Sequence, residues 1–108
     1  MSRLAVVTGG NTGIGRHLVT ALAGAGYDVA FSWIDRPDMT ESLIAEVEAT
    51  GRRGFGHRCD VGHEGDVVAF YDAVQEWAGT APHLLVNNAG VQTPVSYTHL
   101  RAHETGRN

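Results

Sequence analysis

Apolar residues gather in three short runs along the chain, separated by segments with helical spacing. Runs of this length, rich in branched residues and bounded by glycine or polar residues, are typical of buried parallel strands. The runs are Leu4–Thr8, Val29–Ile34 and His83–Val86, and a weak strand is expected near Gly54–Arg58. We therefore predict four short strands.

Two of the intervening segments carry a clear helical stripe. In the first, the stripe consists of Ile14, Leu18 and Leu22, widened by Val19 and Ala25. In the third, it consists of Val67, Phe70, Tyr71, Val74, Trp77 and Ala78. Glycines stand where each helix would stop, at Gly24 and Gly26 for the first and at Gly79 for the third.

The second helical segment has a predicted start as well as a stripe. Asp38 and Glu41 have the spacing of a capping box, which satisfies two backbone N–H groups at a helix N-terminus. Leu43, Ile44 and Val47 form the stripe, and Gly51 ends it. Strands and helices thus alternate along the chain.

This alternation predicts an α/β fold built from parallel βαβ units. Right-handed crossovers then place the first two helices on one face of the sheet. If the fourth strand returns beside the first, the third helix covers the other face. The expected architecture is a Rossmann-type doubly wound parallel sheet, truncated, with strand order 3-2-1-4.

Composition narrows the possible functions. The chain has 108 residues and a formal net charge of −4, and this acidity argues against a nucleic-acid partner. The sequence has no stretch long enough to span a membrane and no signal-peptide pattern. The lone cysteine excludes a disulfide within the chain, so we expect a cytoplasmic location. All 8 basic residues are arginines, so a mechanism that needs a lysine is excluded for this chain.

The last residues depart from the pattern. Residues 95–108 have no clean period, and Val95–Thr105 resembles one reading frame of a transposase adapter used in sequencing libraries. We therefore expect residues 1–94 to form the amino-terminal part of a dinucleotide-binding domain and residues 95–108 to be a non-native tail. The alternative is a natural polar terminal segment.

A glycine-rich loop, Thr8–Gly15, joins the first strand to the first helix. Backbone N–H groups at a helix N-terminus bind phosphate when no Cβ atoms stand in the way. We expect Gly9 to allow a sharp turn, Gly13 to allow approach to a pyrophosphate, and Gly15 to allow helix–strand packing. Ile14 belongs to the same predicted binding loop. The strand–loop–helix context favours a dinucleotide, although glycine turns alone are common.

Three motifs together resemble the short-chain dehydrogenase/reductase family. The spacing Thr-Gly-x-x-x-Gly-x-Gly of the loop matches that family, as do Cys59-Asp60-Val61 after the third strand and Asn87-Asn88-Ala89-Gly90 after the fourth. The resemblance covers residues 1–94 and is greatest to the 3-oxoacyl-carrier-protein reductase and sugar dehydrogenase group. It implies hydride transfer between a nicotinamide and a carbonyl or alcohol substrate. It also implies a homo-oligomeric parent protein.

The resemblance assigns roles to the residues that follow the strands. Asp60, beside Val61, would accept from the adenine amino group, or would only cap the strand end. The Asn88 amide would bridge neighbouring strands while its backbone lines the adenosine ribose, and Ala89 and Gly90 would give the cofactor close backbone access.

Two further loop residues and the end of the second strand bear on the cofactor. Asn11 and Thr12 would bond ribose or phosphate oxygens, or would cap the first helix. By resemblance, an NAD-selecting acid would stand at Trp33, where it is absent. Arg36 could bond the 2′-phosphate of NADP, or could be a solvated arginine beside Asp35 and Asp38. We therefore favour NADP over NAD.

No metal site is expected. His57, Cys59 and His63 lie close in sequence, but zinc needs ligands that converge with tetrahedral geometry. No further cysteine is available, and Asp60 already has a predicted role.

No catalytic residue can be assigned. The family's Tyr-x-x-x-Lys pattern has its nearest counterpart in Tyr97 and Arg101, which lie in the suspected tail, and arginine does not replace the lysine point charge. The leading hypothesis is a fragment that retains the cofactor-binding half of a dehydrogenase. The alternatives are a non-catalytic dinucleotide-binding module, such as a redox-sensing regulator, and an unrelated doubly wound protein with a coincidental glycine turn.

Overall fold

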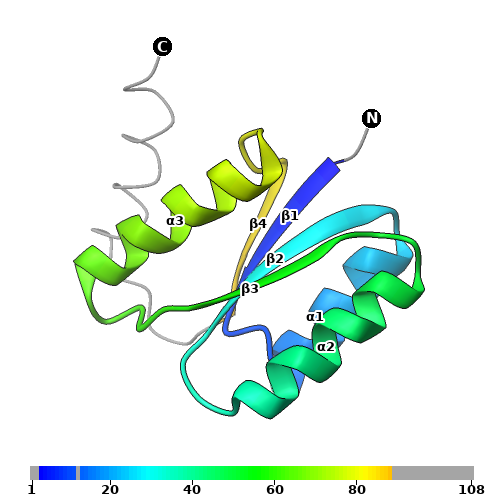
Figure 1. Ribbon diagram of the computed structural model, residues 1–108, viewed down its shortest axis with the longest axis horizontal. Coiled ribbons are helices and arrows are strands. Elements are labelled where there is room, and N and C mark those ends of the chain that lie inside the picture. The colour runs from blue at the N-terminus through cyan, green and yellow to red at the C-terminus, as the bar shows by residue number, and fades with distance from the viewer. Residues whose placement is uncertain (1–2, 12, 89–108) are drawn as a thin grey trace.

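Strands and helices alternate throughout the computed structural model, which describes residues 3–11 and 13–88 (Figure 1). In chain order the elements are β1 (Arg3–Thr8), α1 (Gly13–Gly24), β2 (Tyr27–Trp33), α2 (Pro37–Ala49), β3 (Gly54–Arg58), α3 (Glu64–Ala78) and β4 (Leu84–Asn87). All seven predicted elements are present, with boundaries displaced by a few residues at most.

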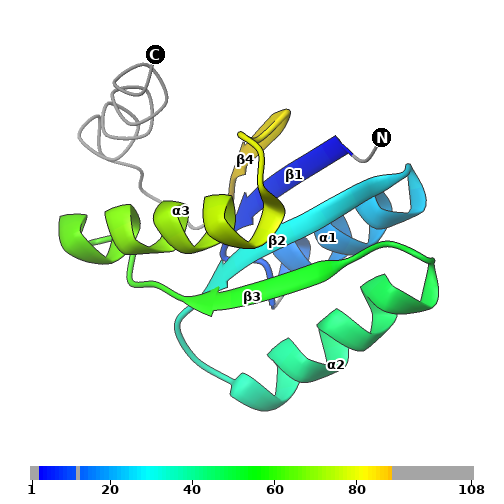
Figure 2. The ribbon, with the colours of Figure 1, turned by 45° about the horizontal axis from the view of Figure 1, so that its top comes forward.

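The four strands form one parallel sheet in the order β3-β2-β1-β4. Helices α1 and α2 lie on one face of the sheet and α3 lies on the other (Figures 1 and 2). The α/β fold class, the strand order and the placement of the helices predicted from the sequence are therefore confirmed.

Strand β1 lies between β2 and β4 and is covered on both faces. Leu4 and Val6 pack against α3, whereas Val7 packs on the side of α1 and α2. From Leu4 to Thr8 every residue is buried, which explains why the run is apolar without alternation.

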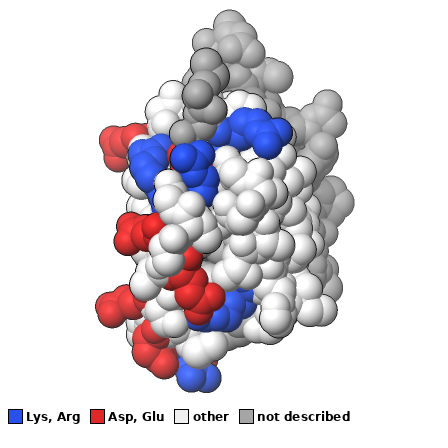
Figure 3. Space-filling model, turned by 90° about the vertical axis from the view of Figure 1, so that its right-hand side faces the viewer, with Lys and Arg blue, Asp and Glu red and all other residues white. Residues whose placement is uncertain are grey.

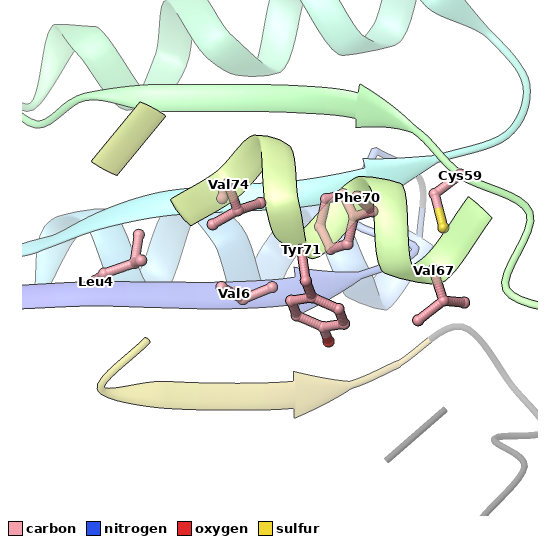
Figure 4. Packing of buried hydrophobic residues seen from close by; sticks show 8 residues of the cluster. Leu4, Val6, Cys59, Val67, Phe70, Tyr71 and Val74 are labelled. Carbon is pink, nitrogen blue, oxygen red and sulfur yellow. The ribbon is translucent and has the colours of Figure 1, made fainter. Parts of the chain in front are cut away.

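The core beneath α3 follows the predicted stripe. Val67, Phe70, Tyr71 and Val74 are buried against Leu4, Val6 and Ala30 of the sheet (Figure 4). Trp77 and Ala78 pack at the margin of this cluster. The rings of Phe70 and Tyr71 meet edge to face with centroids 5.0 Å apart, a favoured aromatic geometry.

The stripe predicted for α1 is displaced by one position. Its buried residues are Gly15, Val19 and Ala23, whereas Leu18 and Leu22 are only partly buried. Ile14 is 72% exposed. The helix turns its small residues to the sheet because Gly15 comes into close contact with the loop after β1.

The capping box predicted for α2 is wrong. The helix begins at Pro37, and the capping position is Arg36, in a left-handed backbone conformation (φ 66°) without a side-chain cap bond. Proline suits this first position because it has no N–H to satisfy. Asp38 lies in the first turn, and a hydrogen bond from the Arg36 side chain holds the pKa of its carboxyl below the usual range.

An ion pair ties β2 to the segment before β3. The side chain of Asp28 is 4% exposed and accepts from the Arg53 backbone N–H at 2.9 Å and from its Nε at 3.3 Å. Burial pushes the pKa of Asp28 upward, but these bonds and the charges of Arg53 and Arg52 outweigh it, so the pKa is lowered. Figure 3 shows arginine and acidic side chains interspersed along one edge of this face, beside a broad uncharged surface.

His83 extends the pairing between β1 and β4 by one residue. Its backbone N–H donates to the Leu4 carbonyl at 2.8 Å, and its ring Nδ1 accepts from the Leu4 N–H at 3.0 Å. The Leu4 N–H therefore bonds the imidazole ring of His83 instead of a backbone carbonyl of a neighbouring strand.

Replacing His83 with alanine should lower the free energy of unfolding by about 1 kcal/mol, because the Leu4 N–H loses its acceptor. His83→Asn should retain most of the stability, because its Oδ1 can take the place of Nδ1. Urea denaturation followed by circular dichroism measures both variants. Equal stability of the alanine variant and the unmodified chain would contradict the role given to the ring.

Candidate functional site

The carboxyl ends of the four parallel strands bring together segments that are far apart in sequence. The glycine loop follows β1, Trp33 ends β2, Asp60 follows β3 and Asn88 follows β4. In open parallel sheets, ligands bind in the crevice at this edge. The predicted site residues within the described chain all come from these loops and strand ends, apart from the start of α1.

The loop after β1 is fastened to the end of β2. The Gly9 N–H donates to Ser32 Oγ, and the Gly10 N–H donates to the Ser32 carbonyl, each at 2.9 Å. Gly9 has a φ of 67°, in the left-handed region that glycine adopts without strain. The sharp turn predicted at Gly9 is therefore present.

Gly15 and Asn88 lock the start of α1 onto this turn. Asn88 donates from Nδ2 to the Gly9 carbonyl at 3.0 Å and from its backbone N–H to Thr8 Oγ1 at 2.9 Å. A Cβ on Gly15 would lie 2.0 Å from the Gly9 oxygen and 2.5 Å from Asn88 Nδ2. The structure thus shows the packing role expected of Gly15 and the bridge expected of the Asn88 amide.

Gly13 differs from Gly15 because it faces open space. It has a φ of 57°, and a Cβ built there meets no atom of residues 3–11 or 13–88 within 4 Å. The neighbouring Ile14 side chain is also exposed. The first turn of α1 is therefore accessible to a ligand from this side, and contact of Gly13 and Ile14 with a pyrophosphate stays a prediction.

The Asn11 side chain connects the glycine loop to the β2–α2 connection. It is buried, and Nδ2 lies 2.8 Å from the Asp35 carbonyl, 3.1 Å from the Arg36 carbonyl and 3.0 Å from Thr40 Oγ1. This nitrogen holds two loops together, a role that the sequence interpretation missed because its acceptors lie 24 to 29 positions away. A bond from Asn11 to a ligand stays a prediction.

A pocket of about 220 Å³ opens between the ends of β1, β2 and β3. It is lined by Gly9, Ser32, Trp33, Ile34, Cys59, Asp60 and Val61. Sequence reasoning had named Gly9, Asp60 and Val61 of this group, and the structure brings them together with residues from the end of β2.

Asp60 contributes a carboxylate to this pocket. Its Oδ1 accepts from the Gly62 N–H at 2.9 Å, and its Oδ2 lies 3.4 Å from His63 Nε2. The side chain is 37% exposed, so part of it remains open to solvent. Asp60 therefore caps the turn after β3, which is the alternative role considered for it. Recognition of adenine by Asp60 stays a prediction.

Trp33 is the pocket residue with an unsatisfied polar group. Its Nε1 is buried and has no hydrogen-bond partner, and it is the one such side-chain atom found in the described part of the chain. From the sequence, position 33 is notable only because it lacks the acidic residue that would select NAD. Whether this nitrogen is buried depends on residues from other elements. The local hydrophobic pattern of the sequence therefore could not predict it.

Arg36 lies at the exposed rim of the site. Its guanidinium is 3.5 Å from the Asp38 carboxylate, and its backbone N–H donates to Asp35 Oδ1 at 2.8 Å. Its side chain is 57% exposed. This is the solvated arrangement weighed for Arg36, and contact with a cofactor phosphate stays a prediction.

The histidines and the cysteine considered above as metal ligands lie in three different environments. The His57 ring lies near the rings of Phe55 and Phe70, His63 is near Asp60, and Cys59 is buried. Within residues 3–11 and 13–88, no three His, Cys, Asp or Glu residues are grouped to hold a metal ion. In the same part of the chain, no helix is long and apolar enough to cross a membrane.

Several predicted positions lie outside the described residues. These are Thr12, Ala89, Gly90, Tyr97, Arg101 and the suspected tail 95–108.

Comparison with known proteins shows the family to which this sequence is related. A family model for short chain dehydrogenases matches residues 3–107. The chain is 34% identical over 91 residues to 3-oxoacyl-[acyl-carrier-protein] reductase FabG of Staphylococcus epidermidis, covering 84% of this chain and 37% of that protein. It is 41% identical over 92 residues to 3-beta-hydroxysteroid dehydrogenase of Comamonas testosteroni, covering 85% and 34%.

Solved structures show the same likeness. A short-chain dehydrogenase/reductase variant from Serratia marcescens superposes with a TM-score of 0.78 at 31% identity, over 84% of this chain and 37% of that one. A blue fluorescent protein from a metagenomic library, in complex with NADPH, gives 0.77 at 34% identity, over 82% and 36%. The chain thus spans little more than a third of the length of these proteins.

Gly15→Ala should lower the free energy of unfolding by about 1–3 kcal/mol, because the new methyl group collides with the Gly9 carbonyl and the Asn88 amide. Gly24, in the same helix, faces open space and provides the matched control, Gly24→Ala. That control should leave stability unchanged or slightly raised. Thermal and urea melts of both variants test the packing, and equal melts would refute it.

Cys59 should react slowly with iodoacetamide in the native chain. Burial raises the pKa of its thiol from 9.0 to about 11, with help from the charges of Asp66 and Asp60. Native thiolate is then about a hundredfold scarcer than in the unfolded chain at pH 8. Between these two pKa values, rising pH deprotonates only the unfolded chain and so weakens the fold.

Labelling rates with and without 8 M urea (about the concentration needed for full unfolding) measure this difference. Cys59→Ser is the control that should take up no label, because the chain has 1 cysteine. Equal rates in the two conditions would contradict the burial of the thiol.

Proposed function

Because this chain belongs to the short-chain dehydrogenase family, we propose that it is the dinucleotide-binding part of an NAD(P)-dependent oxidoreductase. The longer protein would transfer a hydride between the nicotinamide and a carbonyl or alcohol substrate. The proposal rests on the family match over residues 3–107 together with the loop after β1. In that loop, Gly15 packs closely against the Gly9 carbonyl, whereas the Cβ position of Gly13 is open.

The residues present fit a dinucleotide. The open Cβ position of Gly13 would admit a pyrophosphate to the N-terminus of α1, where backbone N–H groups and the helix dipole favour anions. The pocket beside it has an apolar lining with one carboxylate, Asp60, which suits an adenine ring with its amino group. When bound, the cofactor supplies or accepts the hydride.

This chain's own residues bind and orient the cofactor in the proposed function. Asn88 holds the turn at Gly9 in place through its amide, and Asn11 keeps the β2–α2 connection against the same turn. Ser32 fixes the turn from the β2 side. The three polar side chains therefore preorganise the backbone that the cofactor would contact.

We further propose that this chain alone does not turn over substrate. The sequence contains no lysine, and the nearest counterpart of the family's catalytic tyrosine, Tyr97, is followed by Arg101 at the lysine position. The proton-transfer groups would come from the remainder of a longer protein. A non-catalytic dinucleotide-binding module is the second candidate, and the missing lysine is the observation in its favour.

NADP is the proposed cofactor in preference to NAD. No carboxylate stands at position 33, and Arg36 follows closely on an exposed connection. A cytoplasmic location for the longer protein is supported by the lone cysteine, which forms no disulfide within the chain. A homo-oligomeric state of that protein is proposed from the family resemblance.

Substitution of Gly13 tests the proposal directly. Gly13→Ala should abolish binding of NADPH and NADH, because the methyl group occupies the space left for the pyrophosphate. Titration followed by fluorescence of the reduced nicotinamide measures binding. Gly51→Ala is the matched control, since Gly51 also has a positive φ (87°) and an open Cβ position, at the amino end of β3.

Both substitutions strain the backbone by about 1–2 kcal/mol. Only Gly13→Ala should lose the nucleotide. If it binds NADPH as tightly as the unmodified chain, the loop is a turn without a binding role.

A further inference from the structure

His63 occupies the capping position of α3 without capping the helix. Its backbone is extended there (φ −113°, ψ 118°), and its side chain makes no cap hydrogen bond. Serine, threonine, asparagine and aspartate are preferred at this position because their side chains accept from the first N–H groups of a helix. The imidazole instead lies beside Asp60, with Nε2 3.4 Å from Oδ2. The ring is thus placed to act on the carboxylate rather than on the helix.

The turn between β3 and α3 holds these two side chains together. The His63 N–H donates to the Asp60 carbonyl at 2.9 Å, which closes a four-residue turn. Asp60 Oδ1 accepts from the Gly62 N–H at 2.9 Å, and the Asp60 N–H donates to Asp66 Oδ2 at 3.2 Å. One oxygen of the Asp60 carboxylate is therefore engaged by the turn itself, whereas Oδ2 lies beside the imidazole.

The two side chains stand where the pocket meets solvent. Asp60 lines the pocket with Gly9 and Val61, and its side chain is 37% exposed. The side chain of His63 is 72% exposed. A ligand in the pocket can therefore reach the carboxylate, while the imidazole exchanges protons freely with water.

The charged groups near the imidazole come from the turn and from the two elements that it joins. Asp60 lies in the turn, Glu64 and Asp66 lie in the first turn of α3, and Arg58 is exposed at the end of β3. The pocket residues at the ends of β1 and β2 are uncharged. Carboxylate and guanidinium groups ordinarily keep their charges between about pH 5.5 and 8.

Imidazole is the side chain that changes charge in this range. The Cys59 thiol, which precedes Asp60, stays protonated because burial raises its pKa to about 11. The positive end of the α3 dipole opposes a charged ring, whereas the carboxylates around it favour one. Protonation of His63 would turn its long contact with Asp60 into a charge-assisted hydrogen bond. That bond competes with any other donor to the same carboxylate.

We propose that His63 makes the recognition of adenine dependent on pH. When the ring is neutral, the Asp60 carboxylate accepts from the adenine amino group. When the ring is charged, the carboxylate is drawn into an ion pair and accepts from the amino group less well. The inference rests on the proposed dinucleotide site and gives that site a regulator outside the glycine loop. An exposed ion pair supports a change of about two- to fivefold in affinity.

Two nucleotides that differ only in the amino group provide the test. Adenosine 5′-monophosphate carries it, and purine riboside 5′-monophosphate does not. The full 108-residue chain is titrated with each by isothermal calorimetry at about pH 5.5 and about pH 8, on either side of the ordinary imidazole pKa. The ratio of the two affinities measures recognition of the amino group, because both nucleotides carry the same phosphate and its titration cancels.

The preference for adenosine 5′-monophosphate should be about two- to fivefold greater at the higher pH. His63→Gln should keep the preference and remove its pH dependence, because the glutamine amide can lie beside Asp60 but does not ionise. His17→Gln is the matched control, since His17 is exposed on α1, and it should behave as the unmodified chain does. The titrations of the unmodified chain remain informative if His63→Gln does not fold.

The outcomes separate the inference from the proposed function. A preference that is equal at the two pH values, or that keeps its pH dependence in His63→Gln, refutes the role of His63 and leaves the dinucleotide site standing. Equal affinity for the two nucleotides at both pH values also refutes it, because Asp60 then does not recognise the amino group. The same holds if NADPH binds and neither mononucleotide does, since adenine recognition then contributes no measurable affinity. If NADPH and NADH do not bind either, the proposed function itself fails.

Discussion

The close approach of Gly15 to the Gly9 carbonyl is the contact on which the rest of the site depends. It brings the N-terminus of α1 down onto the end of β1, with no room for a side chain between them. The Asn88 amide then reaches the same carbonyl from the end of β4. Three segments meet at one backbone oxygen, which is why the crevice has a defined shape before any ligand enters.

This junction also determines which residues face solvent. With Gly15 turned inward, Val19 and Ala23 follow it toward the sheet, and Ile14 is left exposed. Gly13, two positions earlier, keeps open space in front of its backbone. A single tight contact thus produces both the packing of the helix and the accessibility of its first turn.

The polar groups around the junction divide between holding the fold and facing the pocket. Ser32, Asn11 and Asn88 each bond a neighbouring loop or turn, so their side chains mainly preorganise the backbone. Asp60 and Trp33 instead line the pocket, where Asp60 provides a carboxylate. Rigid support beside a small set of ligand-facing groups is the arrangement that binding sites need.

The sequence by itself determined the element order, the sheet and the motif positions, because hydrophobic periodicity and glycine spacing act over a few residues. Tertiary structure decided which side of α1 is buried, where α2 begins, what Asn11 bonds and that the Trp33 nitrogen has no partner. These features arise from contacts between segments far apart in the chain, and a local pattern does not encode the partners of such contacts.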